Sequence, residues 1–127
     1  MKFSLDTKII KPENNIINSA VILLHGYGGD GNDISVLGYN WRRFLPDALF
    51  LCPNAPEVCA VNSHGYQWFD MSIGNNDEMI LKKSLESEKK LNIFLDQVLD
   101  NFGLDVKNIA LVGFSQGCMI AIQTVLK

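Results

Sequence analysis

The residues with the clearest capacity for chemistry lie near the end of the printed chain, where the sequence reads Gly113-Phe114-Ser115-Gln116-Gly117. An apolar run from Ile109 to Val112 precedes this segment and another apolar stretch follows it, so it is expected to turn sharply from a strand into a helix. A serine at such a turn is lifted clear of the sheet, and the two glycines leave room for the tight backbone. The pattern is typical of a nucleophilic serine that attacks an ester or thioester carbonyl. A turn in which glycine serves packing and the serine caps a helix would have the same sequence.

A glycine-rich loop, Gly26-Tyr27-Gly28-Gly29-Asp30-Gly31, follows an earlier apolar run. Its spacing matches the G-x-G-x-x-G fingerprint, so a nucleotide-binding module that uses Gly26 to Gly31 is one alternative function. Asp30 argues against it, because a carboxylate would lie where a pyrophosphate must be held, and no acid ends the next strand. In serine hydrolases a comparable loop supplies a backbone amide to the oxyanion hole. Here the amides of Tyr27 and Gln116 are expected to form that hole.

The base that a serine nucleophile requires is missing from its expected place. An acid and then a histidine should follow the serine, but the twelve residues after Ser115 contain neither. Of the two histidines upstream, His25 is expected to brace its loop through backbone hydrogen bonds. His64 is the alternative base, although nothing in the sequence fixes its distance to Ser115. Capping and turn roles are expected for three carboxylates near the strand ends: Asp30, Asp33 and Asp70.

The elements that must position these residues alternate along the chain. Continuous apolar runs predict buried strands over residues 20–24, 48–52 and 109–112, and residues 3–10 are expected to form an edge strand. Apolar residues at helical spacing predict helices over residues 34–44, over residues 78–102, and from just after Ser115 to the end. This alternation predicts a three-layer α/β fold with a parallel sheet and a ligand site at the carboxyl ends of the strands.

Residues that begin and end helices set the expected boundaries. Asn32 or Asp33 is expected to cap the first helix, and Asp77 the second. Gly103 is expected to end the second helix in the left-handed conformation that glycine adopts easily.

Composition limits the class of protein. The 127 residues are 47% hydrophobic and 20% charged with a net charge of −3, which suits one globular domain over residues 1–127. No block of like charges predicts binding to nucleic acid or to an anionic membrane. No apolar run is long enough to span a bilayer, and early charges argue against a signal peptide, so a cytoplasmic location is expected. The three cysteines form no C-x-x-C pair, which predicts free thiols rather than a disulfide or a zinc site.

Four motifs occur in a fixed order in this chain: Leu24-His25-Gly26-Tyr27-Gly28-Gly29, Pro53-Asn54-Ala55-Pro56, Gln67-Trp68-Phe69-Asp70 and Gly113-Phe114-Ser115-Gln116-Gly117. Together they resemble the phospholipase/carboxylesterase family of α/β-hydrolases, which includes the acyl-protein thioesterases. The resemblance covers almost the whole chain but only about the N-terminal half of the family's domain. It therefore implies a C-terminally truncated α/β-hydrolase sheet.

The resemblance also implies roles for single residues. Ser115 would be the nucleophile, the backbone amides of Tyr27 and Gln116 would form the oxyanion hole, and Trp68 would border the acyl site. No metal or organic cofactor is expected, and the substrate is expected to be a small, neutral acyl ester or thioester.

The truncation has two expected consequences. Without an acid and a histidine the chain alone should be almost inactive, so a non-catalytic remnant that binds an acyl group or another ligand is a second alternative. The strand from Ile109 to Val112 would be central in the complete fold but lies at an edge here. We expect this edge to recruit a second copy of the chain or a C-terminal segment.

Overall fold

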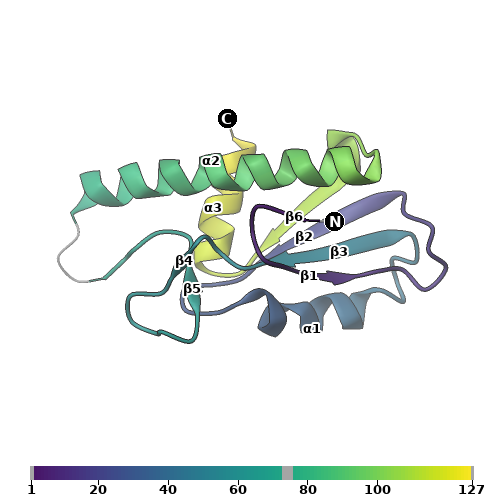
Figure 1. The fold of residues 1–127 in the computed structure, drawn as a ribbon, viewed down its shortest axis with the longest axis horizontal. Helices are drawn as coiled ribbons and strands as arrows, with labels where there is room; N and C mark the ends of the chain where they lie inside the picture. Colours follow the sequence, from purple (N-terminus) through teal and green to yellow (C-terminus); the bar gives the residue numbers. More distant parts are fainter. Residues whose placement is uncertain (1, 73–75, 127) are drawn as a thin grey trace.

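The computed structural model describes residues 2–72 and 76–126, and it arranges them in three layers (Figure 1). A four-stranded sheet with the order β1-β3-β2-β6 forms the middle layer. Its strands are β1 (Thr7–Ile10), β2 (Ser19–Leu24), β3 (Ala48–Pro53) and β6 (Ile109–Gly113). Helix α1 covers one face of the sheet, and helices α2 and α3 cover the other (Figure 1). The predicted three-layer α/β architecture is confirmed.

The sheet is mixed rather than wholly parallel. Strand β2 lies between β3 and β6 and runs parallel to both. The three strands predicted from the apolar runs are therefore parallel, as expected, whereas the edge strand β1, whose direction was not predicted, pairs antiparallel with β3. The strand is also shorter than the predicted range of residues 3–10. Only residues 11–18 separate β1 from β2, and a connection between parallel strands needs a longer, usually helical, crossover.

The first helix begins earlier than expected. Helix α1 spans Gly31–Trp41, and its N-cap is Asp30, whose carboxylate accepts a hydrogen bond from the Asp33 amide over 2.7 Å. The prediction of Asn32 or Asp33 as the cap is therefore wrong. The carboxylate of Asp30 can reach the third amide of the helix, which is the usual geometry of a capping aspartate.

The long second helix shows a similar small shift at its start. Helix α2 spans Asp77–Phe102 and is capped by Asn76, whose side chain accepts from the Met79 amide over 2.8 Å. The prediction of Asp77 as the cap is thus wrong by one position. Gly103 ends the helix with φ of 62°, as predicted. Helix α3, Gln116–Val125, starts directly after the serine, which is also as predicted.

A small hairpin was not predicted from the sequence. Strands β4 (Glu57–Val58) and β5 (Tyr66–Gln67) pair antiparallel, and they belong to the connection between β3 and α2. Each has two residues, which is too short for an alternating pattern to be recognised. A short 3-10 helix, η1 (Val106–Asn108), leads into β6.

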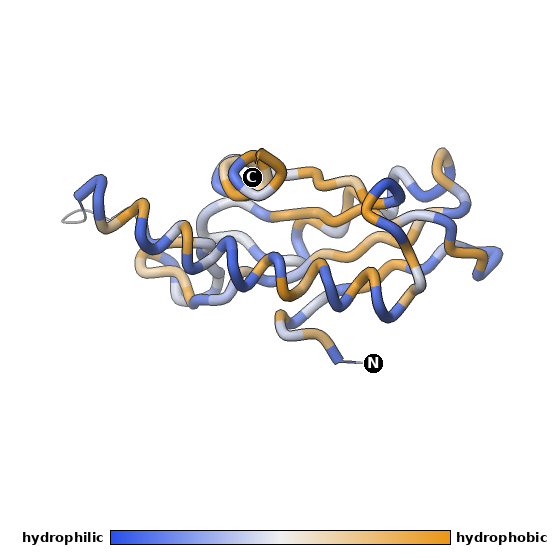
Figure 2. Tube along the Cα trace, turned by 90° about the horizontal axis from the view of Figure 1, so that it is seen from above, coloured by the Kyte–Doolittle hydropathy of each residue, from blue (hydrophilic) through white to orange (hydrophobic). Residues whose placement is uncertain are grey.

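Alternate residues of the central strands build two cores. Ile22, Leu24 and Leu51 belong to the core beneath α2 and α3. Leu23 and Phe50 belong to the core beneath α1. Because both faces of these strands are buried, their sequences are continuously apolar. Figure 2 shows long hydrophobic stretches in the middle of the molecule, whereas the colours alternate along the long helix α2.

The side of the sheet at β6 is open. Strand β6 is the last in the sheet order, so its outer edge has no partner strand among the described residues. Helix α3 beside it carries exposed apolar side chains, among them Ile122, Val125 and Leu126. The recruitment of another chain or segment to this edge stays a prediction.

Candidate active site

Ser115 occupies the turn between β6 and α3 in a backbone conformation that non-glycine residues rarely adopt. Its φ is 55° and its ψ is −114°. Such conformations cost free energy and are found mainly where function requires them. The residue is exposed, and its side chain makes no capping hydrogen bond to α3. The structure therefore gives no support to the interpretation of this serine as a helix cap.

The glycines on either side of Ser115 are required by close backbone contacts. A β-carbon added to Gly113 would lie 2.4 Å from the backbone nitrogen of Cys118. A β-carbon added to Gly117 would lie 2.1 Å from the carbonyl oxygen of Leu24. Both distances are far below van der Waals contact, so the turn can close only because neither residue has a side chain.

The first glycine loop lies directly beside the serine. The Phe114 amide donates to the carbonyl of Leu24 over 3.0 Å, which fixes the turn against the end of β2. A β-carbon built on Gly26 would lie 3.4 Å from Ser115 Cβ and 3.3 Å from the Phe114 carbonyl oxygen. Two segments that are far apart in the sequence thus meet at one point. The convergence of the Tyr27 and Gln116 amides on a single oxyanion position stays a prediction.

Three of the six amides of the loop from Gly26 to Gly31 donate hydrogen bonds within the protein. The amide of Gly28 donates to the Tyr66 carbonyl over 2.8 Å, and that of Gly29 donates to the Gly26 carbonyl over 3.0 Å. The amide of Gly31 donates to the Asn54 side-chain oxygen over 2.7 Å. A dinucleotide site would need such amides for a pyrophosphate, so these bonds disfavour the nucleotide-binding alternative.

His25 braces this loop, as its position next to Gly26 predicted. Its Nδ1 lies 2.7 Å from the carbonyl oxygen of Gly26, and its Nε2 accepts a hydrogen bond from the Ala55 amide over 2.9 Å. Because Nε2 is the acceptor, Nδ1 carries the proton and donates to Gly26. Burial lowers the pKa of His25, which favours this neutral tautomer. With both ring nitrogens bonded to backbone, His25 has a structural role.

The side chain of Gln116 was not identified from the sequence, where only its backbone amide was considered. It is buried, its oxygen accepts from the Trp68 amide over 2.8 Å, and its nitrogen donates to the Phe69 carbonyl over 2.7 Å. These bonds join the serine turn to the segment that follows β5. No local pattern signals such a contact, because the partners lie 47 and 48 positions apart.

Trp68 is buried against the start of the glycine loop and is not on an open surface. Its side chain is 1% exposed, and its indole nitrogen donates to the carbonyl of His25 over 2.9 Å. The centroids of the Trp68 and His25 rings are 5.6 Å apart. Trp68 thus connects Gln116 with His25 and supports both halves of the site. A direct contact between Trp68 and an acyl group stays a prediction.

His64 lies in a hollow that does not include the serine. Polar and charged residues line this hollow beside His64, among them Asp6, Lys8 and Asn54. Neither Ser115 nor Phe114 belongs to its lining. This position gives no support to His64 as the base.

Two of the three carboxylates for which capping or turn roles were predicted have such roles in the structure. Asp30 caps α1. Asp70 accepts from the Ser72 amide over 2.8 Å, a short-range turn contact, and the Tyr27 hydroxyl lies 3.4 Å from the same oxygen. Asp33 lies exposed in the first turn of α1.

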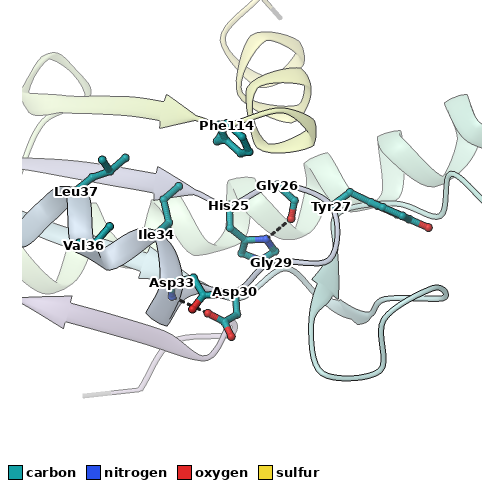
Figure 3. Close-up of a pocket in the computed structure, with 10 residues that line it drawn as sticks. All are labelled: His25, Gly26, Tyr27, Gly29, Asp30, Asp33, Ile34, Val36, Leu37 and Phe114. Atoms are coloured by element: carbon teal, nitrogen blue, oxygen red, sulfur yellow. Dashed lines mark hydrogen bonds between the residues drawn. The ribbon is translucent and has the colours of Figure 1, made fainter.

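An apolar hollow of about 330 Å³ opens beside the serine turn (Figure 3). One wall consists of Ile34, Val36 and Leu37 from α1. The ring of Phe114 lies across from these side chains, and Gly26 and His25 line the end of the hollow at the glycine loop. We call this space the α1 hollow.

Other features concern cofactors, membranes and thiols. Within residues 2–72 and 76–126, no group of three or more His, Cys, Asp or Glu side chains is placed to hold a metal ion. No helix in the same two ranges combines the length and apolar character needed to cross a bilayer. Cys52, Cys59 and Cys118 are all free thiols.

Comparisons with known proteins identify the family that the chain resembles over nearly its whole length. A family model described as phospholipase/carboxylesterase matches residues 5–127. The acyl-protein thioesterase 1 of Schizosaccharomyces pombe is 30% identical over 127 residues, which cover 96% of this chain and 55% of the yeast protein. The acyl-protein thioesterase 1 of Candida albicans is 28% identical over 119 residues, covering 84% of this chain and 49% of that protein.

Solved structures give the same result. The crystal structure of esterase PE8 superposes with a TM-score of 0.89 at 38% identity and covers 94% of this chain and 56% of the esterase. A carboxylesterase from Bacillus cereus superposes with a TM-score of 0.70 at 24% identity, which shows the shared fold; the match covers 94% of this chain and 52% of that one. The chain thus spans about half the length of the relatives it matches.

Proposed function

Because the chain belongs to the phospholipase/carboxylesterase family of α/β-hydrolases, we propose that it supplies the nucleophile half of a serine hydrolase acting on esters or thioesters. One observation carries the proposal: Ser115 is exposed in a strained turn, directly beside the Gly26 loop. A nucleophile and a neighbouring loop that can stabilise the oxyanion are the two parts that acyl transfer needs in one place.

In the proposed reaction the Ser115 oxygen attacks the carbonyl carbon of the substrate and its proton passes to a base. The carbonyl oxygen becomes negatively charged and is stabilised by the amides of Tyr27 and Gln116. Collapse of this intermediate releases an alcohol or thiol, which takes the proton. Water then attacks the acyl-serine in the same way, releasing a carboxylic acid and regenerating Ser115.

The base is the part that the described residues do not supply. His25 has both ring nitrogens bonded to backbone, and His64 lies in a separate hollow. No histidine or acid follows Ser115 in the printed sequence. We therefore propose that residues 1–127 alone turn over ester very slowly, and that a polypeptide carrying a histidine and an acid restores activity. The lack of a base beside Ser115 also favours a second candidate, a protein that binds acyl groups without hydrolysing them.

The proposed substrate is a small, neutral acyl ester or thioester. The α1 hollow beside the serine turn is mainly apolar, and no lysine or arginine lines it, so burial of apolar surface would provide the affinity. All three cysteines are unpaired, the form that thiols keep in a reducing compartment. The cytoplasm is therefore the proposed location.

A fluorophosphonate probe and a short-chain ester assay test the function. Both are applied to the chain alone and to the chain mixed with a second polypeptide that carries an acid followed by a histidine. Little labelling or turnover is expected before the addition, and clear turnover after it. Ser115→Ala should abolish this activity, whereas Ser63→Ala, a matched change of a serine in an exposed loop, should not.

The same assay separates the alternatives. Rapid hydrolysis by the chain alone that is lost in His64→Ala would identify His64 as the base and overturn the proposed need for a second polypeptide. Binding of a non-hydrolysable ester analogue, with no turnover under any of these conditions, would favour the non-catalytic candidate.

A further inference from the structure

The loop that contains Tyr27 has little rigidity of its own. Glycine stands on both sides of Tyr27, at positions 26 and 28, and Gly28 has a φ of 82°. Glycine adopts many backbone conformations at similar free energy, so a peptide group next to it can rotate unless other groups hold it. The direction of the Tyr27 amide must therefore be set by hydrogen bonds rather than by local backbone preference.

The planarity of the peptide bond links that amide to the carbonyl of Gly26. Both belong to the peptide group between Gly26 and Tyr27, which is trans. In a trans peptide group the carbonyl and the N–H point in opposite directions. A contact that fixes the Gly26 carbonyl therefore also fixes the Tyr27 N–H, which points to the opposite side.

Two donors hold the Gly26 carbonyl. Nδ1 of His25 lies 2.7 Å from its oxygen, and the Gly29 amide donates to the same oxygen over 3.0 Å. Figure 3 shows this carbonyl turned toward the His25 ring, with Phe114 on the other side of Gly26 in this view. The Tyr27 N–H consequently points away from the ring. It has no acceptor among residues 2–72 and 76–126.

A third segment decides that the His25 ring donates at Nδ1. The Ala55 amide donates to Nε2 over 2.9 Å, so Nε2 carries no proton in this arrangement and Nδ1 carries it. His25 is 2% exposed, so water has little access to either nitrogen. The ring is therefore a donor of fixed direction, placed directly before the loop that it holds.

Trp68 fixes the preceding peptide group in the same manner. Its indole N–H donates over 2.9 Å to the carbonyl of His25, which belongs to the peptide group between His25 and Gly26. The backbone amide of Trp68 is in turn held by the side chain of Gln116. Side chains thus orient two consecutive peptide groups beside the serine turn, where a β-carbon on Gly26 would come within 3.4 Å of Ser115 Cβ.

We propose that His25 is a positioning residue, whose Nδ1–H holds the Gly26 carbonyl and thereby directs the Tyr27 amide toward the oxyanion of the substrate. This inference rests on the proposed function, because it takes the Tyr27 amide as an oxyanion donor. The ring contacts no reacting atom and transfers no proton in this role. It holds the donor in place before the reaction, so that no reorientation is needed as the negative charge develops.

Two substitutions at position 25 separate the roles of the two ring nitrogens. In His25→Asn the side-chain amide nitrogen takes the place of Nδ1 and can still donate to Gly26, while the Ala55 amide loses its acceptor. In His25→Gln the side-chain oxygen takes the place of Nε2 and can still accept from Ala55, while the Gly26 carbonyl loses a donor. Each variant removes one buried hydrogen bond, so similar decreases in the urea midpoint are expected. Only His25→Gln should release the Tyr27 amide.

Residual dipolar couplings of the backbone N–H groups measure the direction of that amide without substrate. The isotopically labelled whole chain is compared with both variants, and circular dichroism checks that each variant is folded. The Tyr27 coupling should be the same in the unaltered chain and in His25→Asn, and it should change in His25→Gln. The Gln116 coupling should stay the same in all three proteins. An unchanged Tyr27 coupling in His25→Gln would overturn the proposal.

The tautomer of His25 is a second test, and it needs no substitution. Nitrogen chemical shifts of an imidazole ring distinguish a proton on Nδ1 from a proton on Nε2. In the unaltered chain at neutral pH, the His25 ring should carry its proton on Nδ1. The exposed ring of His64 is the reference for an imidazole without fixed partners. A His25 ring protonated at Nε2 would overturn the proposal even if neither variant folds.

Turnover separates this inference from the proposed function. In the mixture with a second polypeptide that carries an acid and a histidine, His25→Gln should lower kcat by about 10²- to 10³-fold and leave KM nearly unchanged, as expected when one oxyanion donor is lost. His25→Asn should restore most of this loss.

The outcomes that would contradict the two proposals differ. Turnover that depends on Ser115 but is equal in the two His25 variants would refute the positioning role and leave the function standing. A Tyr27 coupling that depends on His25, with no turnover in any mixture, would support the orientation of the amide by His25 and contradict the proposed function.

Discussion

The side-chain oxygen of Gln116 accepts a hydrogen bond from the backbone amide of Trp68 over 2.8 Å, across 48 positions of sequence. Trp68 in turn donates its indole N–H to the carbonyl of His25. The serine turn and the glycine loop are thereby connected through one buried glutamine and one buried tryptophan. The relative position of the two parts of the site therefore depends on Gln116 as well as on the glycines of the turn.

Gln116→Ala should lower the free energy of unfolding by about 2–6 kcal/mol. The change leaves the Trp68 amide and the Phe69 carbonyl without their bonds, and each buried, unsatisfied group costs about 1–3 kcal/mol. Gln123→Ala on the same helix is the matched control. It removes a bond to Glu88 that is only partly buried and should cost about 1 kcal/mol. Urea denaturation measures the free energy of unfolding of both variants. Equal decreases in the two would contradict the conclusion that the Gln116 hydrogen bonds connect the two parts of the site.

Gly117→Ala should be far more harmful than Gly103→Ala. The added methyl group at Gly117 would lie 2.1 Å from the carbonyl oxygen of Leu24, whereas that at Gly103 meets nothing within 4 Å. Gly103→Ala costs only the strain of its φ of 62°, about 1–2 kcal/mol. Gly117→Ala must displace backbone and is expected to leave little folded protein, as seen by circular dichroism. Similar thermal midpoints for the two variants would show that the turn can relax.

Replacing the strained serine should increase stability. Ser115 has a positive φ of 55°, a region that glycine adopts at almost no cost. Ser115→Gly should therefore raise the free energy of unfolding by about 1 kcal/mol relative to Ser115→Ala, which keeps the strain. Both variants lack the nucleophile, so the difference between them measures the free energy cost of the backbone conformation at residue 115. No difference between them in urea unfolding would mean that the turn is not strained in solution.

Stability should fall in mild acid because of His25. Burial lowers the pKa of His25 from its ordinary value of 6.5, so below that pH the unfolded chain binds a proton that the folded chain does not. The free energy of unfolding should then decrease as pH falls from about 7 to about 5, with a slope of at most about 1.4 kcal/mol per pH unit from this residue. Protonation at Nε2 would also remove the acceptor of the Ala55 amide.

Two histidine variants identify the source of that pH dependence. His25→Asn should make the urea midpoint less dependent on pH over the same range, although the variant is less stable throughout. His64→Asn should keep the dependence, since His64 is exposed. A decrease in stability at low pH that is retained in His25→Asn and lost in His64→Asn would contradict the assignment of this pH dependence to His25.

The sequence by itself determined two kinds of feature. These are the strands, which show as apolar runs, and the tight turns, where only glycine fits beside the backbone. Continuous apolar runs identified the strands at residues 20–24, 48–52 and 109–112, since residues buried on both faces must all be apolar. The glycines at 113 and 117 identified the serine turn, because no side chain fits there. Gly103 ended α2 for a similarly local reason, its left-handed conformation.

The tertiary structure alone decided which distant residues meet. Whether β1 runs parallel or antiparallel to β3 depends on the path of the chain between them, and the bonds of Gln116 depend on how α3 packs against the segment after β5. The α1 hollow is a space between a helix and a turn, so no single segment encodes it. Patterns in a sequence report local burial and local space, whereas these contacts arise only when the separate layers pack together.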